Sequence, residues 1–353
     1  MFTKDFYFDL PEELIAQKPS GIRGQDKLMV LDRSTGNVSH FMMENLPSLI
    51  PHDALMVFNN SRVRRSRVYG IKDTTGRECE FLFINPLNLH ETSDKYVSTW
   101  KTMVKNAKKQ KPGCTYHFPD GTMGTILENP EDTGTEFRTL GLDRLTDENW
   151  LEKNGHIPLP PYIRREDTEE DSHRYQNIYA TETGSSACPT AGLHFTEPMM
   201  ETLDSMGIQR AWVTLHVGLG TFLPVRAEKI EDHKMHFENY SITQETADLV
   251  TQAKKDGRPV LAVGTTSVRT LEAAWDKNNN CLPAGINSTN IFMYPGYKFN
   301  VVDKMFTNFH TPESTLLMLV SAFAGKENIM NAYKSAVENR YRFFSYGDAM
   351  LIL

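Results

Sequence analysis

The sequence lacks the features that direct a chain into a membrane or out of the cell. It has no run of about 18 apolar residues, the length that a membrane-spanning helix needs. The first ten residues, Met1 to Leu10, lack the basic and then apolar layout of a signal peptide. We therefore expect a cytoplasmic protein with no membrane partner. Internal repeats and low-complexity segments are absent as well.

Cysteine is scarce, and its spacing excludes two further classes of protein. The four cysteines lie far apart, at Cys79, Cys114, Cys188 and Cys281. This spacing matches neither a zinc site nor a compact disulfide framework. We predict free thiols.

An excess of positive charge is also missing, because the formal net charge is −7. This balance argues against a protein coated in basic residues for nonspecific nucleic-acid binding. Local clusters nevertheless exist: four arginines in Arg62–Arg67, five lysines in Lys101–Lys111, and the acidic run Glu166–Asp171. Each one alone is typical of a solvated surface. The two basic clusters flank one β-rich region, which favours a polyphosphate partner.

What is present is ordinary globular material, 353 residues long with 39% hydrophobic and 24% charged residues. Short apolar runs separated by Gly, Pro, Asp and Asn predict strands before residue 68 and an almost purely β region over 68–142. From Phe195 onward, helical and strand patterns alternate, as in a largely parallel α/β sheet. We predict an α/β protein with a large mixed α/β domain (residues 1–67 plus 143–353) and an inserted small barrel-like all-β domain (68–142).

Four loops carry the chemistry-bearing residues. Each has glycine, hydroxyl, histidine or arginine side chains where an apolar stretch ends: Pro189-Thr-Ala-Gly-Leu-His-Phe-Thr196, Leu215-His-Val-Gly-Leu-Gly-Thr221, Asp232-His-Lys-Met-His-Phe-Glu238 and Val263-Gly-Thr-Thr-Ser-Val-Arg-Thr270. Glycine permits close backbone approach, and the other side chains supply donors and proton carriers. Together they indicate a pocket for a polar small molecule.

The loop Val263–Thr270 follows an apolar strand and opens a predicted helix. Its first N–H groups have no partner within the helix and favour a carboxylate, phosphate or ribose hydroxyl. The alternative is that Thr266 and Ser267 only cap the helix. Arg269, one turn further, strengthens the ligand-binding interpretation.

Two other loops leave their alternatives open. The Gly-x-Gly of Leu215–Thr221 lacks the third glycine of a dinucleotide fold and is weak evidence for one. His194 is a candidate general base or ligand donor, but a histidine that bonds its own turn explains the pattern equally well.

The segment Asp232–Glu238 resembles a metal site at first sight, with His233, His236 and Glu238 close together. With this spacing the three side chains cannot share one face of a helix or of a strand, so we expect no metal. His236 and Glu238, two apart in an extended segment, point the same way. They are a candidate acid–base pair.

Longer motifs surround these loops and occur in a fixed order. Read in full, they are Phe8-Asp-Leu-Pro-Glu-Glu-Leu-Ile-Ala-Gln17, Pro189–Thr196, His216-Val-Gly-Leu-Gly-Thr-Phe222, Pro224-Val-Arg226, Met235-His-Phe-Glu238, Gly264-Thr-Thr-Ser-Val-Arg269, Thr307-Asn-Phe-His310 and Tyr341-Arg-Phe-Phe-Ser-Tyr-Gly-Asp348. This set closely resembles the S-adenosylmethionine:tRNA ribosyltransferase-isomerase family of queuosine biosynthesis. The likeness runs from Phe8 to the C-terminus.

The resemblance implies that the ribose of S-adenosylmethionine moves to the aminomethyl group of a 7-deazaguanine in tRNA. The ribose then becomes an epoxycyclopentane, and adenine and methionine leave. Such a reaction needs a base for the proton beside the sulfonium, an acid for the departing adenine, and a pocket closed to water. It implies no cofactor beyond the co-substrate S-adenosylmethionine, and the anticodon stem-loop of tRNA as partner. We expect a monomer.

The loops and the resemblance together give three groups of candidate site residues. The catalytic candidates are His194, His236 and Glu238. The candidates for substrate binding are Asn59, Arg62, Thr190, Gly192, His216, Gly218, Gly220, Thr221, Gly264, Thr265, Thr266, Ser267 and Arg269. The candidates for tRNA binding are Arg64, Arg65, Lys105, Lys108 and Lys109.

One position departs from the family pattern. The family has Asn-Asp-Thr-Arg-Val where this chain has Asn59-Asn-Ser-Arg-Val63, so an amide at Asn60 replaces a carboxylate. Two other hypotheses remain to be tested. An RNA-binding module that has lost catalysis would also explain Asn60 and the basic clusters, and a metal-dependent hydrolase would use His233, His236 and Glu238.

Overall fold

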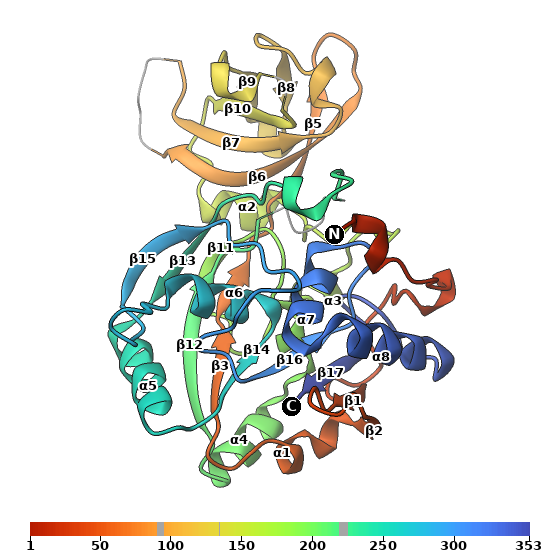
Figure 1. Ribbon diagram of the computed structural model, residues 1–353. Helices are drawn as coiled ribbons and strands as arrows, with labels where there is room; N and C mark the ends of the chain where they lie inside the picture. Colours follow the sequence, from red (N-terminus) through yellow and green to blue (C-terminus); the bar gives the residue numbers. More distant parts are fainter. Residues whose placement is uncertain (90–94, 134, 219–224) are drawn as a thin grey trace.

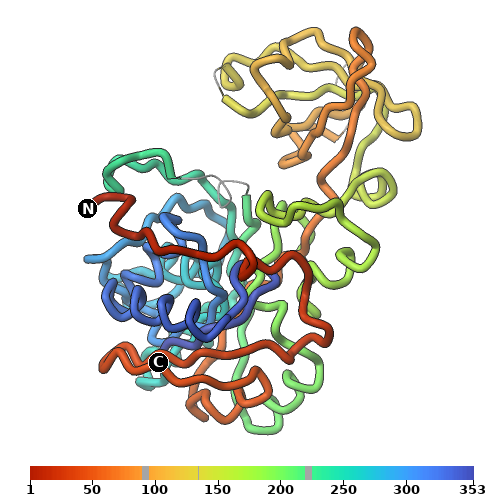
Figure 2. The backbone as a smooth tube through the Cα atoms, turned by 90° about the vertical axis from the view of Figure 1, so that its right-hand side faces the viewer, coloured from red at the N-terminus to blue at the C-terminus, as the bar shows by residue number. Residues whose placement is uncertain are grey.

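Two bodies, a broad sheet covered by helices and a small closed barrel, make up the molecule (Figure 1). The computed structural model describes residues 1–353 except 90–94, 134 and 219–224. Figure 2 shows the barrel set off from the main body and joined to it by neighbouring segments of chain. The predicted α/β fold with a barrel is thus confirmed.

The main body is built on a nine-stranded sheet. In spatial order its strands are β15 (Gly285–Thr289), β13 (Glu238–Ile242), β12 (Gln209–Leu215), β3 (Leu55–Asn59), β14 (Val260–Val263), β16 (Lys304–Asn308), β17 (Ala349–Ile352), β1 (Lys27–Leu31) and β2 (Val38–Met42). The central strands β12, β3, β14 and β16 run parallel. Both flanks contain antiparallel pairs, so the sheet is less parallel than the sequence pattern predicted.

Helices cover both faces of this sheet, because successive residues of a strand point to opposite sides. In β3, Leu55 and Val57 face one hydrophobic core, while Met56 and Phe58 face the other. The helices are α1 (Leu46–Leu49), α2 (Glu148–Asn154), α3 (Glu169–Arg174), α4 (Glu197–Ser205), α5 (Gln244–Lys255), α6 (Thr265–Ala274), α7 (Thr315–Ala324) and α8 (Lys326–Glu338). Short 3₁₀ turns are η1 (Thr3–Phe6), η2 (Glu12–Leu14), η3 (Met43–Asn45), η4 (Ala107–Lys109), η5 (Pro119–Gly121), η6 (Pro130–Asp132), η7 (Thr190–His194) and η9 (Ile230–Asp232).

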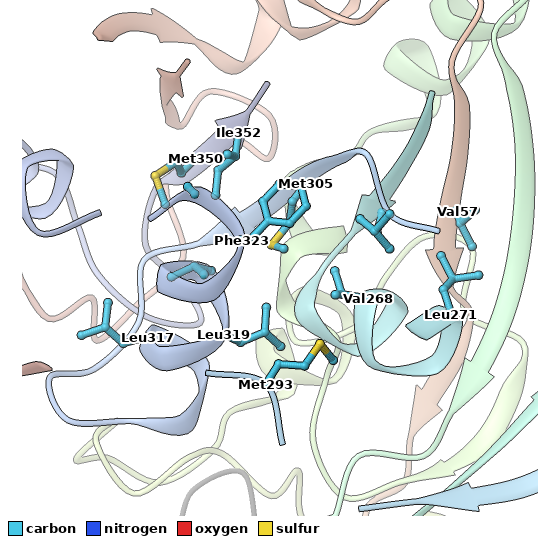
Figure 3. Close-up of a cluster of buried hydrophobic side chains, with 14 of the residues drawn as sticks. Val57, Val268, Leu271, Met293, Met305, Leu317, Leu319, Phe323, Met350 and Ile352 are labelled. Atoms are coloured by element: carbon cyan, nitrogen blue, oxygen red, sulfur yellow. The ribbon is translucent and has the colours of Figure 1, made fainter. Parts of the chain in front are cut away.

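The larger core lies between the sheet and the helices α5 to α8 (Figure 3). Leu319 and Phe323 of α7 and Val268 of α6 pack there with Met305 of β16 and Ile352 of β17. Burial of such side chains contributes about 1.5–3 kcal/mol each. Because β17 pairs with β1 on one side and β16 on the other, the core joins both ends of the chain.

The barrel is closed, in the order β10 (Phe137–Leu142), β7 (Ser98–Val104), β6 (Glu78–Asn88), β5 (Arg67–Lys72), β8 (Thr115–His117) and β9 (Met123–Ile126). Aromatic rings fill it, with Phe81 meeting Tyr116 edge-on at 4.8 Å and Phe83 meeting Trp100 at 5.4 Å. A separate small sheet, β4 (Ser61–Val63) with β11 (Glu182–Ser185), lies where the chain leaves the main body.

Arginines of the first basic cluster hold the barrel to the main body. Arg64 is buried, pairs with Glu148 of α2 and donates to the Ile84 carbonyl at 3.0 Å. Arg65 donates to the Gly155 carbonyl at 3.0 Å, and Arg67 to the Leu159 carbonyl at 2.8 Å. The sequence predicted Arg64 and Arg65 as tRNA contacts. Their donors instead serve the joint between the two bodies.

Gly155, which follows α2, allows the close approach at this joint. A Cβ there would lie 1.8 Å from the Arg65 carbonyl oxygen and 2.6 Å from that of Leu151. Both atoms belong to the backbone, so neither moves cheaply. We predict that Gly155→Ala lowers the free energy of unfolding by about 1–3 kcal/mol, as overpacking does. Urea unfolding followed by circular dichroism measures it.

Gly21 provides the matched control. A Cβ at Gly21 would meet no atom within 4 Å. Gly21→Ala should therefore leave the unfolding midpoint close to that of the unsubstituted protein. Equal midpoints for both variants would contradict the tight joint.

Candidate active site

A pocket opens at the carboxyl ends of the parallel strands β14 and β16, where ligands commonly bind in open α/β sheets. It encloses about 720 Å³, its opening to solvent included. We call it the reaction pocket. Hydroxyl groups dominate the polar part of its wall: Tyr162, Thr190, Thr265, Thr266, Thr307, Thr311, Ser314 and Ser345.

The loop after β14 forms one wall. Gly264 has a φ of +87°, a conformation that favours glycine, and a Cβ at this position would lie 3.4 Å from the Cβ of Ala191. Helix α6 begins at the next residue, Thr265. The Thr266 hydroxyl is buried and makes no hydrogen bond within the described residues. This wall therefore presents the N-terminal end of a helix to a ligand, with the unpartnered hydroxyl buried behind it.

A chain of hydrogen bonds runs into the opposite wall. The buried His194 contacts Asp26 through Nδ1 at 2.7 Å and Asn308 through Nε2 at 3.0 Å. The Thr190 hydroxyl donates to Asn308 Oδ1 at 3.0 Å. The Asn308 amide also donates to the Phe344 carbonyl, which requires its nitrogen to point toward His194.

These partners set the direction of every proton in the chain of hydrogen bonds. Asn308 Nδ2 donates to His194 Nε2, so the neutral imidazole carries its hydrogen on Nδ1 and donates it to Asp26. Thr190 uses its one hydrogen on Asn308. The oxygen of Thr190 consequently presents lone pairs to the pocket and selects a ligand group that donates.

Asp26 is the ionised end of this chain of hydrogen bonds. Burial by itself raises the pKa of Asp26, but the hydrogen bond from His194, together with Ser20 and Arg342, outweighs burial and leaves that pKa lowered. Arg342 lies 3.3 Å from Asp26 Oδ1. The carboxylate of Asp26 accepts from Nδ1 and so fixes the orientation and tautomer of the His194 ring.

The titratable groups of the pocket wall stay neutral. Burial raises the pKa of Tyr162 to about 12, despite a 2.5 Å hydrogen bond to the Ser345 hydroxyl. Burial also raises the pKa of the Cys188 thiol and lowers that of His310 to about 3. The wall that the described residues form is thus polar but uncharged, which suits a sugar and a purine.

A buried ion pair lies beyond Val217, another residue of the wall. Arg269 of α6 pairs with Glu238 at the start of β13, and their side chains are 5% and 4% exposed. Glu238 also accepts the Gly218 N–H at 3.1 Å. The pair thus holds the backbone at Gly218, and two buried donors of Arg269, Nε and Nη2, have no acceptor among the described residues.

Known proteins match this chain over its whole length. A family model described as queuosine biosynthesis protein matches residues 3–352. Proteins named S-adenosylmethionine:tRNA ribosyltransferase-isomerase are 58% identical in Treponema denticola and 46% identical in Clostridioides difficile, with all of both chains covered. The chain belongs to the queuosine biosynthesis protein family. The resemblance predicted from the motifs is confirmed.

A solved structure supports the same assignment. The S-adenosylmethionine tRNA ribosyltransferase of Thermotoga maritima is 34% identical and is matched with a TM-score of 0.55. The match covers 99% of this chain and 100% of that one. The family's fold therefore extends over this whole chain, and the reaction pocket lies within it.

The structure brings some of the predicted residues of this family member to the reaction pocket. Thr190, Gly264, Thr265 and Thr266 line it. His194 lies one hydrogen bond behind the wall, at Asn308. Gly220 and Thr221 lie outside the described residues.

Other predicted substrate-binding residues have structural partners instead. Asn59 is 1% exposed, and its amide bonds the backbone of Ser61 and Leu215. Ser267 is fully buried and donates to the Val263 carbonyl at 2.8 Å. Gly192 is buried against the side chains of Tyr179 and Asn177, which leave no room for a Cβ. These residues shape the pocket from behind.

Two predicted polar positions lie near the joint. His216 packs against Gly184, and burial, followed by the charge of Arg64, lowers its pKa. Arg62 is exposed. Asn60 bonds Thr181 and Thr214, so the amide that replaces the family's carboxylate is a bridging group between neighbouring segments.

The expected pair of His236 and Glu238 does not form a common site. His236 is exposed, whereas Glu238 is buried beside Arg269. The reason is that Glu238 begins a strand whose first side chain points into the core. His233 packs on Phe292 at 5.4 Å, and the described residues hold no cluster of His, Cys, Asp or Glu suited to a metal ion.

Sequence patterns missed several residues of the site. Asp26 stands in no motif, and its role follows from a contact with His194 across 168 positions. Asn308 and His310 did stand in the quoted motif Thr307–His310 but were not assigned a role. Tyr162 and Ser345 line the pocket from two further segments. All four cysteines are free thiols, as predicted.

His310 generates a prediction about acid stability. The unfolded chain binds a proton at His310 below its ordinary pKa of 6.5, whereas the folded protein does so only below about 3. Stability therefore falls as the pH drops from 6.5 toward 3. At about pH 5 this costs about 2 kcal/mol. The His310→Gln variant keeps a polar group near Thr307. Between about pH 7.5 and about pH 5, its free energy of unfolding should fall by about 2 kcal/mol less than that of the unsubstituted protein.

Urea unfolding at both pH values measures this difference. The control is His52→Gln, since His52 is exposed. An equal acid-induced loss in the His310→Gln variant and the unsubstituted protein would contradict the assignment.

Proposed function

We propose that this chain is an S-adenosylmethionine:tRNA ribosyltransferase-isomerase. It would transfer the ribose of S-adenosylmethionine to the aminomethyl group of 7-aminomethyl-7-deazaguanine in tRNA and isomerise it, giving epoxyqueuosine-tRNA, adenine and methionine. The observation that carries the proposal is the reaction pocket, uncharged and rich in hydroxyls, in a chain 58% identical to an enzyme of that name.

The pocket's chemistry supports binding of the adenosine part. Ribose hydroxyls and the adenine amino group can each donate a hydrogen bond to the Thr190 oxygen, whose own hydrogen is used on Asn308. Neutral Tyr162 and His310 add no charge that would compete with the sulfonium. A polar wall with few charges holds the co-substrate while limiting access of water.

Proton transfer is assigned to two centres beside the pocket. His194, backed by ionised Asp26, supplies a proton carrier once Asn308 turns toward the ligand. Glu238 is the second candidate, although its pairing with Arg269 also makes it a positioning residue. His236 remains a candidate only as an exposed group at the end of the same segment.

The tRNA partner follows from the same activity, with the anticodon stem-loop as its docking element. Lys105, Lys108 and Lys109 are exposed on the barrel and remain candidate phosphate contacts. We divide the chain into a large domain (residues 1–67 plus 143–353) and an inserted domain (68–142). The three lysines lie in the inserted domain. We further propose a cytoplasmic monomer. No helix of the described residues is long and apolar enough to cross a membrane.

Adenine release tests the function. The purified chain is incubated with S-adenosylmethionine and tRNA that carries the 7-aminomethyl-7-deazaguanine, and adenine is quantified by liquid chromatography. Adenine and ribosylated tRNA should appear in equal amounts. Release no faster than without tRNA would instead favour an RNA-binding module that has lost catalysis.

The lone pairs of Thr190 give a sharper prediction. Thr190→Val keeps the shape but removes the acceptor, so KM for S-adenosylmethionine should rise roughly five- to tenfold, the effect of one hydrogen bond. Thr190→Ser keeps the hydroxyl and should stay within about twofold of the original. Steady-state kinetics with saturating tRNA measures both. An unchanged KM in the valine variant would contradict the orientation of the hydrogen-bond chain.

A further inference from the structure

A second pocket lies beside the reaction pocket and holds arginines. It encloses about 260 Å³, its opening included, and we call it the arginine pocket. Its polar lining consists of Ser20, Arg23, Asp26, Arg174, His194, Ser345 and Tyr346. The proposed reaction uses Asp26 and His194 of this lining but gives no role to Arg23 or Arg174.

Arg23 has donors to spare in this pocket. Its Nη2 donates to the carbonyls of His173 at 3.0 Å and Arg174 at 3.4 Å. Its Nε and Nη1 have no hydrogen-bond acceptor among the described residues, and no carboxylate there forms an ion pair with it. Arginine presents its five N–H groups as a planar fork that matches anionic oxygens. The backbone contacts hold this fork in place.

The local charge is positive. Burial, and then the charge of Arg174, lowers the pKa of Arg23, so the two cations act on each other. Arg174 donates to the carbonyls of Ser20 at 2.6 Å and Gly21 at 3.4 Å, and its one carboxylate partner among the described residues is the exposed Glu170, at 3.6 Å. The one carboxylate that the described residues place in the pocket lining, Asp26, is occupied by His194 and Arg342. An anion between the two arginines would relieve their repulsion.

The position of the arginine pocket relates it to the reaction pocket. Ser345 lines both, and His194 of the arginine pocket bonds Asn308 of the reaction pocket at 3.0 Å. The segment that carries Arg23 is surface chain, with Ile22 62% exposed. Gly24, at a φ of +85°, turns this segment against Thr196 and the His194 carbonyl. An RNA strand that inserts one nucleotide into the reaction pocket would pass along the exposed segment that carries Arg23.

We propose that Arg23 and Arg174 bind a backbone phosphodiester of the tRNA, next to the nucleotide that enters the reaction pocket. This inference rests on the proposed function, which supplies tRNA as the substrate. A carboxylate of the methionine part of S-adenosylmethionine has the same anionic chemistry. We favour the phosphodiester because the arginine pocket is reached from exposed chain, and because His194 and Asn308 stand between it and the reaction pocket.

Binding rather than turnover tests the proposal. An anticodon stem-loop RNA is titrated with the full chain over a range of salt concentrations, and fluorescence anisotropy gives Kd. Arg23→Gln should weaken binding on the order of tenfold, because a hydrogen-bonded contact to a charged group is lost. The slope of log Kd against log salt should flatten by about 0.7, the value for one single-stranded phosphate contact. Arg23→Lys keeps the charge, so its slope should stay unchanged.

Single methylphosphonate substitutions in the RNA identify the phosphate. One substitution beside the target nucleotide should weaken binding to the unsubstituted protein and have a clearly smaller effect on the Arg23→Gln variant, which keeps Arg174. Such coupling between one phosphate and one arginine is not produced by general misfolding. Urea unfolding of each variant checks the fold separately.

Arg210→Gln is the matched control, since Arg210 is a part-buried arginine that pairs with Asp204 away from both pockets. It should leave Kd and the salt slope unchanged. An Arg23→Gln variant with unchanged slope and no phosphate coupling would overturn the proposal. A loss of S-adenosylmethionine affinity in calorimetry, with RNA binding intact, would overturn it in favour of the carboxylate. Failure of the proposed function would show instead as absent adenine release by the unsubstituted protein.

Discussion

The hydrogen-bond chain from Asp26 through His194 and Asn308 to Thr190 is the constraint on which the site depends. It joins segments that lie 168 and 114 positions apart in the sequence. His194 and Asn308 each have a partner on both sides, so their buried polar groups are paired. One buried carboxylate thereby orients an imidazole, an amide and finally the Thr190 hydroxyl, which lines the reaction pocket.

Charge is arranged in layers around that chain. The pocket wall is neutral because burial shifts the pKa values of Tyr162 and His310 away from their charged forms. Charged groups stand one layer back, as the Asp26–Arg342 contact on one side and the Glu238–Arg269 pair on the other. The lining itself is therefore polar and uncharged, and the ionised side chains lie behind it.

Local sequence signals predicted much of the α/β part. The alternation of helices and strands after Phe195 was predicted because its signals are local: Thr243 and Ser314 cap the first turns of α5 and α7, and apolar residues recur at helical spacing. The loop after β14 was likewise correctly associated with a pocket. The C-terminal strand β17 was not predicted, because a short apolar run shows no periodicity. Its pairing with β1 and β16 depends on strands far away in the chain.

The sequence by itself determined the family, the order of the elements and the loops from which the pocket is made, because these depend on residue type and local spacing. Tertiary structure alone decided which polar side chains reach the pocket. In the fold, Asp26 contacts His194, and Asn59 and Ser267 form hydrogen bonds with the backbone. Arg64 pairs with Glu148 where the barrel joins the main body. Those assignments follow from burial and long-range contact, and a buried polar group must find a partner wherever the fold brings one.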